Sequence, residues 1–296
     1  MATLSSLTSL RTSLQVPSTD TSENTALSQY LDQAEALIRE WVHQRWSVPP
    51  AVYTDYLDGR NTSRLRLRQR PVRVSIVTGT LTSGSAVVTS TTTTGLVAGM
   101  PVSNLGTGFT TGVAAGTTIS TVDSATQMTL SAAAQSSGSQ SLYVGAAVYL
   151  DQAGFYGSGE TPFPSSTQLV PGLDFAVIPD QYDYSSRSGL LERIGGVWPP
   201  LVEYTRGYLH AGLRDTRGPV KVVYAAGFAT GSVPADIELA VNLVAANIRS
   251  LRLGAAINSE GYDGYSLSLT RGKRGIDPLE PAMSLLTRWR SLDMGV

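Results

Sequence analysis

The side chains that could support catalysis are few and scattered along this sequence. Cysteine is absent and histidine occurs twice, which excludes thiol chemistry and a multi-histidine metal centre. Two pairs of carboxylates could serve as general acid and base; they are Asp180 with Asp183 and Glu192 with Glu203. Any soluble chain of this length contains such pairs, and the nucleotide-binding and nucleophile motifs are missing. We therefore expect a protein that is not an enzyme and that uses no cofactor and no metal.

A run of arginines without an acidic residue is the most distinctive charged feature. Its members are Arg60, Arg64, Arg66, Arg68, Arg70 and Arg73. On an extended strand, alternate side chains from Arg64 to Arg70 would share one face, with Leu65 and Leu67 on the other. That face is either a solvated outer surface of a sheet or a basic surface for phosphate groups or an acidic partner. The sequence alone leaves both interpretations open.

Charge is distributed unevenly along the chain. The sequence holds 22 basic and 23 acidic residues, yet Asp123 is the only charged residue from 78 to 146. Short runs rich in threonine and valine, separated by turns, predict β-structure in this stretch. We expect an inserted β domain over residues 78–146, between two parts of one core at 1–77 and 147–276. A terminal docking helix or arm follows at 277–296.

Apolar periodicity predicts helices in both flanks of the inserted block. Leucines at helical spacing predict a short helix near the N-terminus, and a longer apolar stripe predicts a helix over residues 25–46. Another helix is expected to begin after Pro234, and the last at Asp277, where Glu280 would complete a capping box. No apolar run reaches the roughly 18 residues of a membrane span.

An ordered set of motifs runs through the two flanks. In chain order they are Tyr56-Leu57-Asp58-Gly59, Leu65-x-Leu67-x-x-Arg70-Pro71-Val72, Gly189-Leu190-Leu191-x-Arg193, Val197-Trp198-Pro199, Val220-x-Val222-x-Tyr224-x-x-Gly227-Phe228, Pro234-x-Asp236-Ile237 with Ala240, and residues 259–267. Together they resemble successive segments of the phage head–tail connector family, also described as adaptor or head-completion proteins. The block at 78–146 departs from the minimal pattern of that family. It resembles threonine- and glycine-rich β modules of phage virion proteins.

The resemblance implies a fold and an assembly. The fold would be α+β, with a helical connector core, a small β-sheet, and an inserted all-β, sandwich-like domain. The protein would be a structural virion protein that forms a homo-oligomeric ring, a dodecamer, between the portal vertex and the tail or stopper. Genomic DNA would pass through this ring. The protein would be made in the host cytoplasm and would reside in the virion neck, without membrane contact.

The resemblance also assigns candidate site residues. The C-terminal arm would dock on the portal protein through Asp277, Leu279, Met283, Leu286, Arg288, Trp289 and Arg290. The arginine strip, which consists of Arg64, Arg66, Arg68 and Arg70, would line the DNA channel or a subunit interface. As an alternative function, the block at 78–146 would bind another capsid or tail protein, or a surface glycan. Its aromatic residues, Phe109 and Tyr143, are too few for a sugar platform, which favours protein contact.

Overall fold

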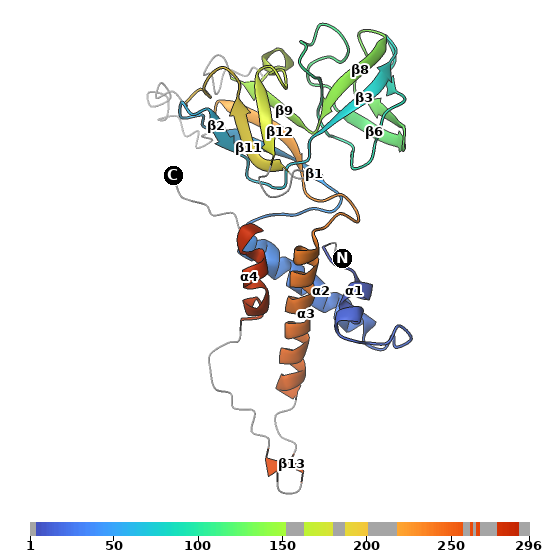
Figure 1. Ribbon diagram of the computed structural model, residues 1–296, viewed down its shortest axis with the longest axis vertical. Helices are drawn as coiled ribbons and strands as arrows, with labels where there is room; N and C mark the ends of the chain where they lie inside the picture. Colours follow the sequence, from blue (N-terminus) through green and yellow to red (C-terminus); the bar gives the residue numbers. More distant parts are fainter. Residues whose placement is uncertain are drawn as a thin grey trace, which may run out of the picture. The chain divides into compact units, whose positions relative to one another are not determined.

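The chain folds into two compact units. The computed structural model describes residues 4–151, 163–179, 187–200, 218–256, 261–262, 265–266 and 277–289. One unit consists of Met1–Val48 together with Thr230–Val296, and the other is Pro49–Ala229. The second unit is therefore inserted between the two parts of the first, as the colouring of Figure 1 shows.

The first unit is a small helical bundle built around α3 (Figure 1). Its elements are α1 (Leu7–Ser13), α2 (Asn24–Val42), α3 (Ala235–Ala256), the short hairpin of β13 (Gly261–Tyr262) and β14 (Tyr265–Ser266), the 3-10 turn η4 (Glu280–Ala282), α4 (Met283–Leu286) and the 3-10 turn η5 (Thr287–Trp289). α1, α2 and α4 all pack against α3. The side chains of Ile237, Val241 and Val244 on α3 are consequently inaccessible to solvent.

The backbone conformation of His43 marks where α2 ends. Its apolar stripe is buried from Leu27 to Val42, which agrees with the predicted periodicity. α2 is nevertheless shorter than the helix predicted over residues 25–46. His43 adopts a left-handed conformation with φ of 55°, and a residue in that conformation ends an α-helix.

The second unit contains four three-stranded antiparallel sheets within the described part of the chain. Two of them share one core. The first has the order β1 (Ala51–Leu57), β12 (Val220–Ala226), β9 (Ala146–Leu150), and the second has the order β10 (Phe175–Pro179), β11 (Arg187–Arg193), β2 (Arg64–Arg66). A 3-10 turn, η1 (Ser165–Thr167), precedes β10. The largest buried side chains of this core are Trp198, Tyr224 and Phe175.

The other two sheets of this unit enclose a separate core. One has the order β3 (Ser75–Leu81), β8 (Gly138–Val144), β5 (Val102–Asn104), and the other has the order β4 (Val87–Val88), β7 (Gln127–Leu130), β6 (Ile119–Ser124). Leu81, Met100, Ile119 and Leu142 are among the residues that fill this core. A β-rich region is therefore present in the block with almost no charge. The exact domain boundaries at 78 and 146 stay a prediction.

Gly145 is the only residue between β8 of one core and β9 of the other. Its φ is +114°, and a Cβ at this position would overlap the carbonyl oxygen of Arg73. Its N–H donates to the carbonyl of Pro101 at 2.9 Å, and its own carbonyl accepts from the N–H of Ala225 at 2.7 Å. Only glycine fits where the chain passes between the two cores.

The predicted fold class is wrong. We expected a helical connector core with a small sheet, whereas the larger of the two units, Pro49–Ala229, is built in its described part from four small antiparallel sheets. Among the described residues, the helices of four or more residues all belong to the first unit. The reason is long-range pairing: Ala51 of β1 lies opposite Ala226 of β12. The local two-residue repeat of a strand does not show which distant strand it pairs with, so the extent of the β unit was not recognised.

Candidate functional site

Two motifs from distant parts of the sequence interlock before β2 begins. The N–H of Gly59 donates to the carbonyl of Pro199 at 3.0 Å. Trp198 donates two hydrogen bonds. Its main-chain N–H donates to the carbonyl of Thr62 at 2.8 Å, and its indole N–H donates to the carbonyl of Ser63 at 3.1 Å. A Cβ on residue 59 would overlap the backbone of Trp198 and Pro199, so glycine is required there. These contacts fix the position from which β2 starts.

β2 carries Arg64 and Arg66 of the arginine strip along the edge of its sheet, and Arg68 and Arg70 follow after the strand ends. Leu65 and Leu67 are buried, whereas Arg64, Arg66 and Arg68 are exposed. Three of the four arginines of the strip are therefore exposed. The fourth, Arg70, is only partly exposed.

The arginines of the strip differ in their surroundings. The guanidinium of Arg64 makes an ion pair with Glu192, with 3.2 Å between Nη2 and Oε1. The aliphatic stem of Arg70 passes over Gly189, where a Cβ would lie 2.6 Å from Cγ of Arg70. Arg64 is thus partly neutralised and Arg70 partly covered.

A buried carboxylate fixes the backbone of the strip. Oδ2 of Asp55, in β1, accepts hydrogen bonds from the N–H of Arg68 at 2.9 Å and from the hydroxyl of Tyr224 at 2.8 Å. That hydroxyl in turn accepts from the N–H of Gln69 at 2.9 Å. Burial, and then the charge of Asp55, raise the pKa of Tyr224 far above its ordinary value. Sequence reasoning named Tyr224 only as a member of a family-like motif and did not single out Asp55. The available signal was a carboxylate in the middle of a strand-forming run.

The C-terminal segment (residues 277–289) packs on α3. Its side chains Leu279, Ala282 and Leu286 are buried, the last two completely. The indole N–H of Trp289 donates to Oδ2 of Asp236, in the first turn of α3, at 2.6 Å. The predicted portal-binding residues Leu279 and Leu286 therefore contact the chain's own helical unit in this structure.

The remaining predicted residues of this segment lie in several environments. Asp277 is exposed, and its Oδ1 accepts from the N–H of Leu279 at 2.9 Å. Met283 is half-buried. The side chain of Arg288, and Arg290 as a whole, lie outside the described residues.

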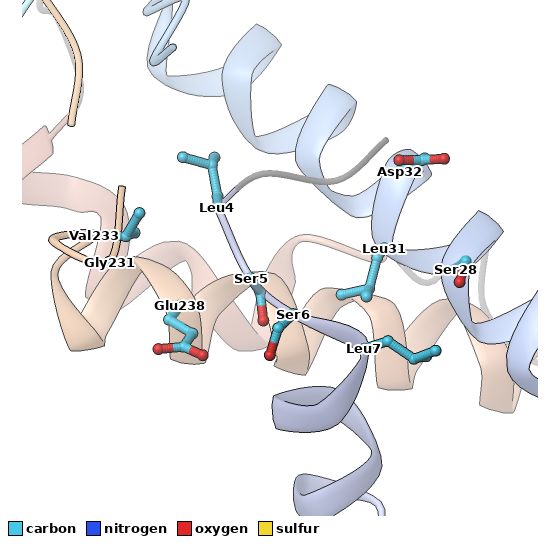
Figure 2. A pocket seen from close by; sticks show the side chains of 10 residues that line it. All are labelled: Leu4, Ser5, Ser6, Leu7, Ser28, Leu31, Asp32, Gly231, Val233 and Glu238. Atoms are coloured by element: carbon cyan, nitrogen blue, oxygen red, sulfur yellow. The ribbon is translucent and has the colours of Figure 1, made fainter. Parts of the chain in front are cut away.

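A pocket of about 550 Å³ lies in the helical unit. Figure 2 shows that Leu4–Leu7 pass through its middle, with Leu31 and Asp32 of α2 on one side and Glu238 of α3 on the other. The N-terminal segment is fastened here by two buried polar side chains. The N–H of Leu4 donates to Glu35 at 2.6 Å, and the hydroxyl of Ser5 donates to Asn242 at 2.8 Å. None of the predicted site residues lines this pocket.

The structure brings together no catalytic constellation within the described ranges. Glu192, from one candidate acid pair, is bound to Arg64. Its partner in that pair, Glu203, and the pair Asp180 and Asp183 lie outside the described residues. Among the residues that can be examined, three or more histidines and carboxylates never gather into a possible metal site. Likewise, none of the described helices is long and apolar enough to cross a membrane.

The aromatic residues of the block at 78–146 do not form a platform. Tyr143 is buried and packs edge-on against Phe175, with 6.1 Å between ring centroids. Phe109 is half-buried in the loop after β5. Neither aromatic residue of the block therefore presents a fully exposed ring face.

Comparisons with known proteins give distant structural matches. No protein-family model and no curated protein matches the chain. A chain in the neck of an empty gene transfer agent particle, computed with C6 symmetry, is 16% identical with a TM-score of 0.40, covering 99% of this chain and 92% of that one. A chain in the virion of the native gene transfer agent particle is 16% identical with a TM-score of 0.39, covering 98% and 91%. A chain in the neck of the native particle, computed with C12 symmetry, is 16% identical with a TM-score of 0.37, covering 97% and 91%. Similarity at this distance does not establish a shared function.

Proposed function

We propose that this protein is a structural, non-enzymatic component of the neck of a phage-type particle. It forms a homo-oligomeric ring, a dodecamer, between the portal vertex and the tail or stopper, and genomic DNA passes through it. It is made in the host cytoplasm and assembled into the virion.

One observation carries this proposal. Five of the seven segments that resemble the connector family lie between Tyr56 and Phe228, and many of their apolar residues meet in a single core. The other two segments, which begin at Pro234 and Ser259, belong to the other unit. That core contains Leu65, Leu67, Val72, Leu191, Trp198, Val220, Val222 and Tyr224. Residues that resemble one family in order and also converge in space behave as one structural unit.

We further propose that residues 277–296 contact the portal. Because Leu279 and Leu286 are buried on the chain's own helical unit, contact through those two side chains requires the segment to leave α3 first. The side chains that already face outward include Asp277, Glu280 and Ser284. These polar residues could reach a partner without that step.

The proposal is tested by mixing the purified protein with the portal protein of the same particle. Negative-stain images should show a ring stacked coaxially on the portal. A chain that lacks residues 277–296 should keep a circular-dichroism spectrum of folded protein and lose portal binding. Full-length protein that leaves the portal bare would contradict the neck assignment, and unchanged binding by the truncated chain would contradict the role of the segment.

The arginine strip is proposed to face the DNA passage or a neighbouring subunit. Arg66 and Arg68 are the side chains to test because both are exposed, and Arg64, which pairs with Glu192, serves as a comparison. Reversing both charges with Arg66→Glu and Arg68→Glu should reduce genome retention or assembly. The matched control is Arg64→Gln, which changes the paired position on the same strand. Normal yields of filled particles from the double variant would favour a solvated face.

A further inference from the structure

The C-terminal segment (residues 277–289) binds a site on α3 of the same chain through specific contacts. Two polar contacts hold its ends: the side-chain amide of Asn247 donates to the carbonyl of Pro278 at 3.3 Å, and Trp289 donates to Asp236 at 2.6 Å. Asp236 and Asn247 lie about 16 Å apart along the helix axis at 1.5 Å per residue. The segment therefore runs antiparallel to α3 in a defined register.

Apolar contacts fill the space between these two ends. Leu286 and Ala282 are fully buried, and Leu279 is 8% exposed. The ring of Trp289 also meets Trp46 edge-on, at 5.9 Å between centroids and an interplanar angle of 86°. A helix as short as α4 is not stable in water by itself. The site on α3 therefore gives this segment its structure.

We propose that the same site accepts the C-terminal segment of a second copy of this chain, so that neighbouring copies exchange segments. The side chains and the main-chain carbonyl that fix the segment are present in every copy of the chain. The site therefore fits a neighbour's segment as well as its own. Exchange of an identical element between copies adds a link between them with no new kind of contact.

The covalent connection allows this exchange. α3 ends at Ala256, and residues 257–276 separate it from the C-terminal segment. The β13–β14 hairpin turns back on itself between Gly261 and Ser266, which leaves 14 of these 20 residues to span a distance. At about 3.3 Å per residue, they cover about 45 Å at most, so a neighbouring site within that distance is reachable. When two copies are adjacent, each segment is tethered close to both sites, and the effective concentrations at the two are comparable. The fraction of segments that bind a neighbour's site therefore depends on how often two copies lie next to each other.

The inference deepens the proposed function, because it names a contact between neighbouring subunits of the ring. It requires only that two copies meet, so it can be tested without the portal. Cysteine is absent from the natural sequence, so introduced thiols react without background.

The test is a cysteine pair in the full-length chain, Asn247→Cys with Pro278→Cys, treated with a short bismaleimide. Pro278 contributes its main-chain carbonyl to the contact, so this substitution keeps the acceptor. In dilute protein the product on a denaturing gel should be monomeric. In concentrated protein a ladder of dimers and larger products should appear. The matched control is Asn247→Cys with Ser284→Cys, because Ser284 is exposed on the outer side of the segment.

Each result has a definite meaning. Monomeric products at every concentration, or a ladder equally strong in the control, would overturn the exchange. A lack of cross-linking at any concentration would overturn the docking site itself. A mixture of two single-cysteine copies, one Asn247→Cys and the other Pro278→Cys with a size tag, should give a cross-linked dimer of mixed mass. A ladder without rings on the portal would refute only the proposed function, whereas rings with purely monomeric products would refute only the exchange.

Discussion

Replacing Gly145 with alanine should lower the free energy of unfolding of the β unit. The loss should exceed the cost of placing a non-glycine residue at a positive φ. A non-glycine residue at φ of +114° costs about 1–3 kcal/mol. The new Cβ would also overlap the carbonyl oxygen of Arg73, which belongs to the backbone and cannot move away by changing rotamer. Relieving this overlap disturbs the hydrogen bonds of Gly145 with Pro101 and Ala225, and each is worth about 1 kcal/mol. We expect a total loss of about 3–5 kcal/mol.

The variant Gly138→Ala separates the cost of a positive φ from the cost of the steric overlap. Gly138 begins β8 with φ of +132°, and no heavy atom lies within 4 Å of the position that its Cβ would take. This variant should lose only the conformational part, about 1–3 kcal/mol. The free energies of unfolding of both variants are measured by urea denaturation with circular dichroism. Equal losses, or a Gly145→Ala variant as stable as the natural protein, would refute the argument that no space exists between the two cores.

Three further predictions concern the candidate surfaces and the loop after β5. Because the pKa of folded Tyr224 is raised, its contribution to stability is complete below about pH 10, the ordinary tyrosine pKa, and falls above it. Urea titrations at alkaline pH should show this fall in the natural protein by up to about 1.4 kcal/mol per pH unit more than in Tyr224→Phe. Asn104→Ala removes four hydrogen bonds to the loop that ends at Val113, so stability should fall by about 2–4 kcal/mol; unchanged amide exchange at Val113 would contradict this. Leu286→Ala empties a fully buried position and should weaken docking of the C-terminal segment by about 2–5 kcal/mol. Tryptophan fluorescence should shift to the red in that variant and not in the exposed control Ser284→Ala.

Local patterns were sufficient to predict the apolar face of α2, the start of α3 and the alternation in β2. The buried stripe of α2 and the start of α3 after Pro234 follow from apolar spacing and from residues that favour helix ends. The exposure of Arg64 and Arg66 on either side of buried Leu65 follows from the two-residue repeat of a strand. These features depend on neighbours within a few residues, so the sequence contains their full cause.

The C-terminal segment was predicted only in part. A helix beginning at Asp277 was expected to present Leu286 and Trp289 to a partner. The structure shows a short α4 between two 3-10 turns, with Leu286 buried on the chain's own helical unit. Amphipathic spacing shows that a helix has a face to bury, but it does not specify the surface that covers that face.

The amino-acid sequence by itself determined the near absence of charge in residues 78–146, the absence of cysteine chemistry, and the short-range elements. Only the tertiary structure decided that β1 pairs with β12, that Gly145 joins two cores, and that Asp55 holds the backbone of the arginine strip through Arg68. The physical reason is the range of the interactions. Helix and strand periodicity arise from neighbours in sequence, whereas sheet order and buried polar contacts depend on residues far apart in the chain, and their free energy is gained only when the whole unit folds.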